Sequence, residues 1–249
     1  MSNIIPYLTF ADPHPDFTQA LVHAYLDSGI QTIELGLPFS DPIADGPVIQ
    51  ESHLRALKNN PTLTLQDAFQ WCYQLKKERP VNFILMVTAT LIYFYGIELF
   101  FKEAKRAGIA GLVIPDLILE DANAYLKYGK QYKVPVNLLV SPDIQPSRLQ
   151  TSVKLTQGFI YLISSVGLTG ERAVLSDQLK TISQKIKDIK EVPVYLGFGI
   201  HTPEQVRFAN RYMDGAIIGS HFVQWVSPFL NNTQKAAESI KKRIHELQG

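Results

Sequence analysis

The sequence has very little cysteine: Cys72 is the one cysteine among 249 residues. A disulfide within the chain is therefore impossible, and a reducing compartment such as the cytoplasm fits this composition. Cys72 recurs at helical spacing with Phe69 and Leu75, and this pattern predicts a small buried core residue. The thiol is not expected to take part in chemistry.

An excess of charge of one sign is also missing. Lys and Arg total 24 against 23 for Asp and Glu, and the charges form neither a basic block nor an acidic tail. Proteins that bind nucleic acid normally carry a clustered basic surface, so no nucleic-acid partner is expected.

The sequence lacks a convincing membrane segment. The uncharged stretch 81–97 is shorter than the roughly 20 apolar residues that a membrane span needs, and it contains Asn82, Thr88, Thr90 and Gly96. The first residues have no basic start, which argues against a signal peptide. We expect a soluble chain that does not associate with membranes.

Short apolar runs alternate with amphipathic helical patterns along the whole chain. The expected strands are 4–10, 31–36, 81–87, 111–116, 134–140, 158–164, 192–199 and 215–220. The expected helices are 16–28, 64–78, 97–107, 120–131, 146–153, 175–188, 203–210 and 233–247. This alternation predicts an α/β fold, a (β/α)8 TIM barrel, with an open doubly wound sheet as the alternative. No linker divides the chain, so we expect one domain over residues 1–249.

Two connections are longer than the usual 2–6 residues between a strand and its helix. They run from about 37 to 62 and from about 165 to 174, and both follow the C-terminal end of a predicted strand. TIM barrels keep their active sites at that end.

Glycines at the ends of the last strands suggest a phosphate site. Gly197 and Gly199 end the seventh expected strand, and Gly219 and Ser220 end the eighth. Barrels often bind phosphate at these two positions, through backbone N–H groups and a short helix. Ser220 is expected to be the N-cap of a helix over 221–226. The alternative is that these glycines only close tight turns.

Glu34 is the most informative acid, because it lies inside the second expected strand. Side chains alternate along a strand, so Glu34 and Gly36 share the inner face while Ile33 and Leu35 face the helices. Apolar walls should raise the pKa of an inward carboxyl group, which suits a general acid or base. The alternative is a structural ion pair, but no Lys or Arg lies within ten positions of Glu34.

Asp41 and Asp45 follow in a loop rich in proline and glycine. Taken alone, each is best interpreted as a turn-forming residue, and Asp45 is also a candidate N-cap of the helical pattern that begins at Pro47.

Several reaction classes are excluded by what the sequence lacks. The six histidines show no metal-ligand spacing, no lysine lies in an expected strand, and neither a G-x-S-x-G elbow nor a Walker loop is present. Carboxylate acid–base chemistry on a phosphorylated substrate remains, without a metal or an organic cofactor in this chain.

The motifs "PYLTFADP" (6–13), "IELGLPFSDPIADGPVIQ" (33–50), "YLISSVGLTGER" (161–172), "GFGI" (197–200) and "GAIIGS" (215–220) occur in the order found in tryptophan synthase alpha chains. The chain resembles that family over essentially its whole length. The resemblance implies a TIM barrel that cleaves indole-3-glycerol phosphate to indole and glyceraldehyde 3-phosphate. It also implies a beta-chain partner that carries pyridoxal phosphate, in an α2β2 complex.

The resemblance also implies roles for individual residues. Glu34 matches the general acid and base, and Asp45 matches the acid that accepts a hydrogen bond from the indole N–H. Matches to substrate-binding positions are Tyr7, Tyr161, Thr169, Gly170, Phe198, Gly199, Gly219 and Ser220. Pro38 and Asp41 match the loop that meets the beta chain.

The sequence departs from the family pattern in four places. The family usually has an extra helix before the first strand, whereas the first strand is expected here near Ile4. After the first strand, Phe10 and Ala11 stand where the family usually has Ala and Gly, and Ile118 stands where it usually has Pro. The third strand ends in "MVTATL" instead of the usual Met-x-Tyr-Tyr-Asn-Pro. The four residues from Thr88 through Leu91 therefore differ from the family pattern, and they adjoin the expected pocket.

These departures keep an alternative open. The chain could be a weakly active or inactive barrel that binds and activates a beta chain. A phosphosugar isomerase on a similar barrel would explain the phosphate glycines but not the loop "PFSDPIADGP" (38–47).

Overall fold

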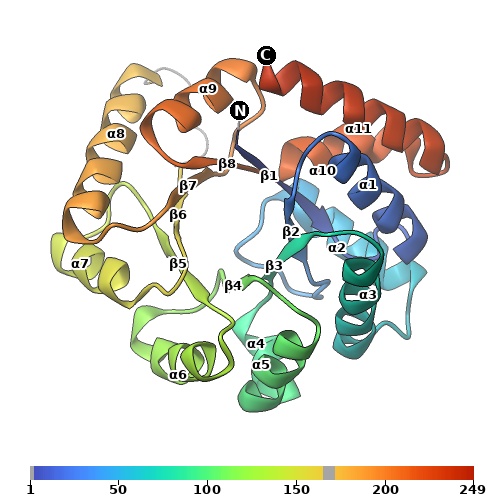
Figure 1. Cartoon of the computed structure of the whole chain (residues 1–249), viewed down its shortest axis with the longest axis horizontal. Coiled ribbons are helices and arrows are strands. Elements are labelled where there is room, and N and C mark those ends of the chain that lie inside the picture. Colours follow the sequence, from blue (N-terminus) through green and yellow to red (C-terminus); the bar gives the residue numbers. More distant parts are fainter. Residues whose placement is uncertain (1–2, 165–171) are drawn as a thin grey trace.

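Eight parallel strands close into a barrel in chain order, and helices form a ring around it (Figure 1). The computed structural model describes residues 3–164 and 172–249, and side chains within them except those of 172–176. The strands are β1 (Ile4–Thr9), β2 (Thr32–Gly36), β3 (Asn82–Met86), β4 (Gly111–Val113), β5 (Val136–Val140), β6 (Ile160–Ile163), β7 (Val194–Gly197) and β8 (Gly215–Ile218). The predicted TIM barrel is confirmed, and each predicted strand contains the strand observed.

The helices lie close to the predicted ranges. They are α1 (Pro15–Asp27), α2 (Pro47–Asn59), α3 (Leu65–Glu78), α4 (Ala89–Tyr95), α5 (Ile97–Arg106), α6 (Ala122–Tyr132), α7 (Pro146–Leu155), α8 (Arg172–Ile189), α9 (Pro203–Tyr212), α10 (Ser220–Val226) and α11 (Thr233–Gln248), with 3₁₀ turns η1 (Leu119–Asp121) and η2 (Ser227–Phe229). Half of the long connection predicted over 37–62 is α2, so only about ten residues of loop separate β2 from this helix.

The buried residues form two separate clusters, which follow the alternation of side chains along the strands. Ile33 and Leu35 pack in the outer cluster, between the strands and the helix ring. The inner cluster fills the barrel with Ile5, Tyr7, Ile49, Ile84, Met86, Val113, Phe159, Tyr161, Ile217 and Val223. Glu34 lies between Ile33 and Leu35 in sequence, so its side chain belongs to the inner face, as predicted.

Two tyrosines inside the barrel each occupy the space over a glycine of the neighbouring strand. A Cβ atom at Gly36 would lie 2.0 Å from the Tyr7 hydroxyl oxygen, and one at Gly197 would lie 2.1 Å from the Tyr161 ring. Real Cβ atoms do not approach other atoms this closely. Gly36 and Gly197 therefore make room for large aromatic rings at the top of the barrel.

The turn after β1 is fastened to α2. Ala11 has a φ of 60°, a left-handed conformation that costs a residue with a Cβ roughly 1–2 kcal/mol. The Asn60 amide donates to the carbonyls of Ala11 and Pro13 at 3.0 and 3.1 Å. Arg55 makes two 2.7 Å bonds to the Asp12 carboxylate. These contacts fix the position of α2, which carries part of the site described below.

Tyr25 gives a prediction about stability. Its ring packs edge-on against Phe222, and its buried hydroxyl has no hydrogen-bond partner among the described residues. Leaving a buried hydroxyl unpaired costs about 1–3 kcal/mol. We expect Tyr25→Phe to raise the free energy of unfolding by about 1 kcal/mol in denaturant titrations.

The matched control for that measurement is Tyr132→Phe. The Tyr132 hydroxyl donates to Glu98 at 2.8 Å, so its removal loses a bond and should bring no gain in stability. A loss of stability in Tyr25→Phe equal to that in the control would mean that the Tyr25 hydroxyl is satisfied.

Candidate active site

A cavity of about 230 Å³ opens inside the barrel at the C-terminal ends of the strands. Its lining comprises Tyr7, Glu34, Asp45, Gly46, Pro47, Val48, Ile49, Met86, Tyr161, Phe198, Gly199, Gly219 and Ser220. The two predicted acids therefore share one cavity with the predicted aromatic residues and with three of the predicted phosphate positions.

Glu34 is buried on β2, with a relative exposure of 1%. Its Oε1 atom has no hydrogen-bond partner among the described residues. Burial, followed by the negative charge of Asp45, raises the pKa of Glu34 to about 8. The carboxyl group is therefore protonated at neutral pH. Because its pKa lies only about one unit above neutral pH, it can also give up this proton readily.

Asp45 lies in the loop between β2 and α2, one residue before the helix N-cap, Gly46. Its backbone N–H donates to the Pro42 carbonyl at 3.0 Å, so Asp45 does lie in a turn. The N-cap role considered for Asp45 is wrong, because Gly46 is the N-cap and no side chain caps α2. Burial and the nearby Asp116 carboxylate raise the pKa of Asp45 to about 6.

Aromatic rings line the cavity beside the acids. The centroids of the Tyr161 and Phe198 rings lie 5.9 Å apart, with the rings tilted by 64°. Burial, helped by the nearby acids, raises the pKa of both Tyr7 and Tyr161 well above its usual value, so both phenols stay neutral. The cavity thus offers flat apolar surfaces together with two carboxyl groups, a combination suited to a planar ring that exchanges protons.

The ends of β7 and β8 form the other side of the cavity. Phe198 and Gly199 have φ values of 66° and 72°, a sharp left-handed turn that glycine adopts without strain. The Ser164 hydroxyl donates to the carbonyls of Gly197 and Phe198 and holds this turn in place. At the start of α10, the first N–H groups lack partners within the helix, as at any helix N-terminus.

Two predictions about this side need correction. Gly219, not Ser220, is the N-cap of α10, and Ser220 is the first helical residue, because the helix begins one residue earlier than expected. Gly197 does not line the cavity, since the Tyr161 ring occupies the space beside it. Glycine is needed at position 197 because the Tyr161 ring packs against it.

The remaining predicted residues lie elsewhere. Thr169 and Gly170, like most of the predicted loop 165–174, fall outside the described residues. Pro38 and Asp41 lie on the loop after β2, where Asp41 is exposed and accepts a hydrogen bond from Ser40 at 3.1 Å.

The unusual segment from Thr88 to Leu91 begins α4, where the Thr88 side chain accepts a hydrogen bond from the Leu91 N–H. None of these four residues lines the cavity, and β3 contributes only Met86 to it. The departure from the family pattern therefore lies at a helix start and not in the wall of the cavity.

Sequence analysis missed two kinds of residue. Met86 lies on the inner face of β3, and Ile49 lies in the first turn of α2; alternation along β3 could have identified Met86. His53 received no role, yet its imidazole contacts the hydroxyl of Tyr7 at 3.0 Å. No local pattern signals a contact between side chains 46 positions apart.

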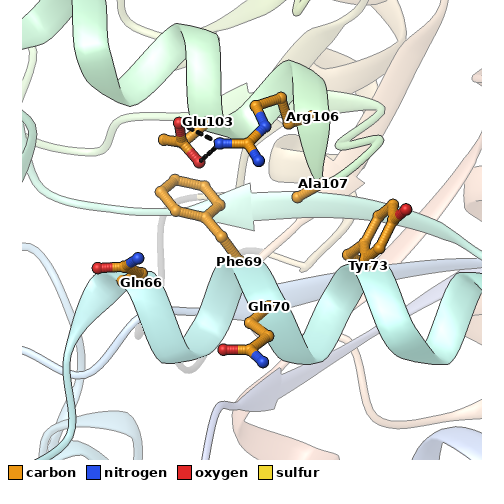
Figure 2. Close-up of a pocket in the computed structure, with 7 residues that line it drawn as sticks. All are labelled: Gln66, Phe69, Gln70, Tyr73, Glu103, Arg106 and Ala107. Atoms are coloured by element: carbon orange, nitrogen blue, oxygen red, sulfur yellow. Dashed lines mark hydrogen bonds and ion pairs between the residues drawn. The ribbon is translucent and has the colours of Figure 1, made fainter.

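A second hollow, of about 440 Å³, lies between α3 and α5 on the outside of the barrel. Figure 2 shows Glu103 and Arg106 of this hollow facing each other. The Arg106 guanidinium donates hydrogen bonds of 3.0 and 3.1 Å to the Glu103 carboxylate. Although this hollow is larger, its charges are paired and it lies away from the strand ends. We therefore take the cavity inside the barrel as the candidate site.

Two further searches covered the described residues only. No group of three His, Cys, Asp or Glu side chains in 3–164 and 172–249 is placed to hold a metal ion. No helix in the same ranges is long and apolar enough to cross a membrane.

Comparisons with known proteins agree with this geometry. The family model described as "Tryptophan synthase alpha chain" matches residues 1–248. The tryptophan synthase alpha chain of Petrotoga mobilis is 34% identical over 98% of this chain and 94% of its own length. That of Lacticaseibacillus casei is 36% identical over 96% and 89%.

Solved structures give the same result. The tryptophan synthase complex from Pyrococcus furiosus contains a chain that matches with a TM-score of 0.87 and 32% identity, covering 98% of this chain and 97% of that one. An aminoacrylate-bound tryptophan synthase from M. tuberculosis matches with a TM-score of 0.83 and 25% identity, over 98% and 93%. Family model, relatives and structures agree across nearly the whole length, and the chain belongs to the tryptophan synthase alpha chain family.

Proposed function

We propose that this chain is a carbon–carbon lyase that cleaves indole-3-glycerol phosphate to indole and glyceraldehyde 3-phosphate. The observation that carries this proposal is the buried Glu34 carboxyl group, whose free oxygen lies in one cavity with Asp45 and aromatic walls. Family membership supplies the reaction class, and the geometry supports the assignment of roles.

Glu34 supplies the acid and the base. Because the pKa of Glu34 is raised to about 8, the group begins the reaction protonated and gives its proton to the indole carbon that bears the side chain. The resulting carboxylate then accepts the proton of the glycerol hydroxyl next to the bond that breaks. The electrons of the broken carbon–carbon bond return to the indole ring, and the hydroxyl carbon becomes the aldehyde.

Asp45 stabilises the positive charge that develops on the ring when its carbon is protonated. An ionised carboxylate that accepts a hydrogen bond from the indole N–H lowers the energy of this intermediate. Asp45, whose pKa is raised only to about 6, is mostly ionised at neutral pH while Glu34 keeps its proton. This difference in pKa divides the roles between the two acids.

The remaining cavity residues hold the substrate. Tyr7, Tyr161 and Phe198 would enclose the indole ring, while Gly199, Gly219 and Ser220 would receive the phosphate through backbone N–H groups at the opposite side. By the family resemblance, Thr169 and Gly170 would complete the site.

A beta-chain partner is supported by the solved complexes that this chain resembles. Large apolar side chains are exposed on three successive connections, after β2, β3 and β4: Ile43 is 84% exposed, Phe94 82%, Tyr93 68% and Ile118 56%. Exposed apolar groups gathered at one end of a protein commonly mark an interaction site. We propose that this partner face, together with Pro38 and Asp41, docks a beta chain that holds pyridoxal phosphate, in an α2β2 complex.

The alternative of a barrel that only activates its partner is less well supported. It rests on the unusual residues Thr88 to Leu91, but these lie outside the cavity, while both acids line it.

The first test is Glu34→Gln, which removes the proton that Glu34 donates and accepts. We expect turnover of indole-3-glycerol phosphate to fall by about 100- to 10,000-fold, both in the isolated chain and with a beta chain. Indole release measures this directly, with the exposed Glu191→Gln as control. Near wild-type turnover in Glu34→Gln would show that Glu34 is not the acid–base group.

The raised pKa of Glu34 also predicts how stability depends on pH. The folded state holds this proton up to about pH 8, whereas the unfolded chain loses it near pH 4.5, so stability falls as the pH rises between these values. From pH 6.5 to 8 we expect a slope of up to about 1.4 kcal/mol per pH unit in denaturant titrations. Glu34→Gln should flatten this slope.

Comparison of wild type with Glu34→Gln separates the effect of Glu34 from that of its neighbours. Asp45, with a folded pKa of about 6, changes stability with the same sign, and its effect is nearly complete by about pH 7. The lowered pKa values of His53 and His221, both about 4, act with the opposite sign, and this effect fades as the pH rises above 6.5. An equal slope in wild type and Glu34→Gln would contradict the prediction.

The partner face gives a further prediction. Phe94→Glu places a charge among apolar groups that would be desolvated on docking, so we expect the affinity for the beta chain to fall about tenfold or more. Calorimetry with a purified beta chain measures this. Tyr73→Glu on α3, which lies outside the partner face, serves as control; equal losses in both variants would argue against docking through α4.

A further inference from the structure

His53 is a buried histidine on α2 that the reaction proposed above does not use. Its imidazole makes two hydrogen bonds to separate parts of the site. Nδ1 accepts from the backbone N–H of Phe39 at 3.2 Å, and Nε2 contacts the hydroxyl of Tyr7 at 3.0 Å. One bond reaches the loop that leads to Asp45, and the other reaches β1 inside the barrel.

The direction of these bonds is fixed by the chemistry of the groups. A backbone N–H can only donate, so Nδ1 of His53 must be unprotonated. Desolvation lowers the pKa of His53 to about 4, so the ring is neutral near pH 7 and carries its hydrogen on Nε2. Nε2–H therefore donates to the oxygen of Tyr7.

The chain of bonds continues along β1, returns to α2 and ends at a backbone carbonyl. The Tyr7 hydroxyl donates to Thr9 at 3.2 Å, Thr9 donates to Ser52 at 2.5 Å, and Ser52 donates to the Ile49 carbonyl at 2.7 Å. The Phe39 N–H, which can only donate, begins the series, and the Ile49 carbonyl, which can only accept, ends it. Each hydroxyl between them therefore has one orientation. A satisfied buried network of this kind is rigid.

The same helix also holds the far end of the loop. The Gln50 amide donates to the carbonyls of Asp45 at 2.8 Å and Pro42 at 3.4 Å. Gln50 and His53 are three residues apart on α2 and lie on neighbouring positions of its surface. The loop over 39–45 is thus held by α2 at its beginning and at its end.

We propose that His53 is a positioning residue, which sets the placement of the Asp45 loop relative to Tyr7 and the barrel interior. This inference rests on the proposed lyase reaction. Tyr7 pairs with Glu34 in the register of β1 and β2, so a bridge from Phe39 to Tyr7 fixes one acid of the pair relative to the other. Misplacement of a reacting group by about 1 Å can cost about 100-fold in rate.

The proposed bridge requires both ring nitrogens of His53. Three substitutions test the two hydrogen bonds separately. His53→Leu removes both bonds, His53→Asn keeps an acceptor near the Nδ1 position, and His53→Gln keeps a polar group near the Nε2 position. We expect kcat to fall about 30- to 100-fold in His53→Leu and about tenfold in each of the other two, with KM within threefold of wild type. His23→Leu on α1, away from the cavity, should leave kcat unchanged.

A purely structural role would give a different result. In that case all three variants would lose stability while kcat per folded molecule stayed within threefold of wild type, and the proposal would be overturned. Retention of full kcat by His53→Asn or His53→Gln would also overturn it, since one bond would then be enough.

Amide hydrogen exchange tests the placement without any need for activity. We expect His53→Leu to speed exchange at residues 39–45 by at least tenfold and to leave the exchange of β5 and β6 unchanged. This readout separates the two proposals: accelerated exchange in a chain without lyase activity would refute the proposed function and keep the positioning role. Unchanged exchange in the loop would refute the positioning role.

Discussion

The structure depends on burying one carboxyl group, that of Glu34, inside a barrel where no described residue places a cation beside it. A buried carboxylate normally has a Lys or Arg partner, or else it takes up a proton. Here the acid Asp45 is the neighbour that acts on it, and it raises the pKa of Glu34 further. The surrounding architecture serves this arrangement: apolar strands exclude water, glycines make room for aromatic rings, and a helix fixes the second acid.

Much of this could be predicted from the sequence, for reasons that are local. Alternation along β2 placed Glu34 on the inner face, and apolar runs between helical patterns predicted the barrel. Asp45 could not be assigned in this way, because an acid before Gly-Pro looks like any turn residue; only the family resemblance gave it a role. The exact residue that caps a helix could not be predicted either: Gly219, and not Ser220, is the N-cap of α10.

Contacts between side chains distant in sequence could not be predicted at all. His53 is 46 positions from Tyr7, and neither residue carries a local signal that they meet. The exclusion of Gly197 from the cavity likewise depends on the Tyr161 ring, which reaches it from the neighbouring strand. Such contacts depend on strand register and helix placement, which exist only in the folded chain.

The exposed aromatic side chains of α4 also affect how the isolated chain behaves in solution. Tyr93 and Phe94 are largely exposed to water, and the net charge of +1 with an isoelectric point near 7.8 provides little repulsion between molecules. Proteins with exposed apolar surface associate most readily where their net charge is near zero. Colloidal stability of the free barrel is therefore lowest near pH 7.8, and covering α4 would raise its solubility without any change in its fold.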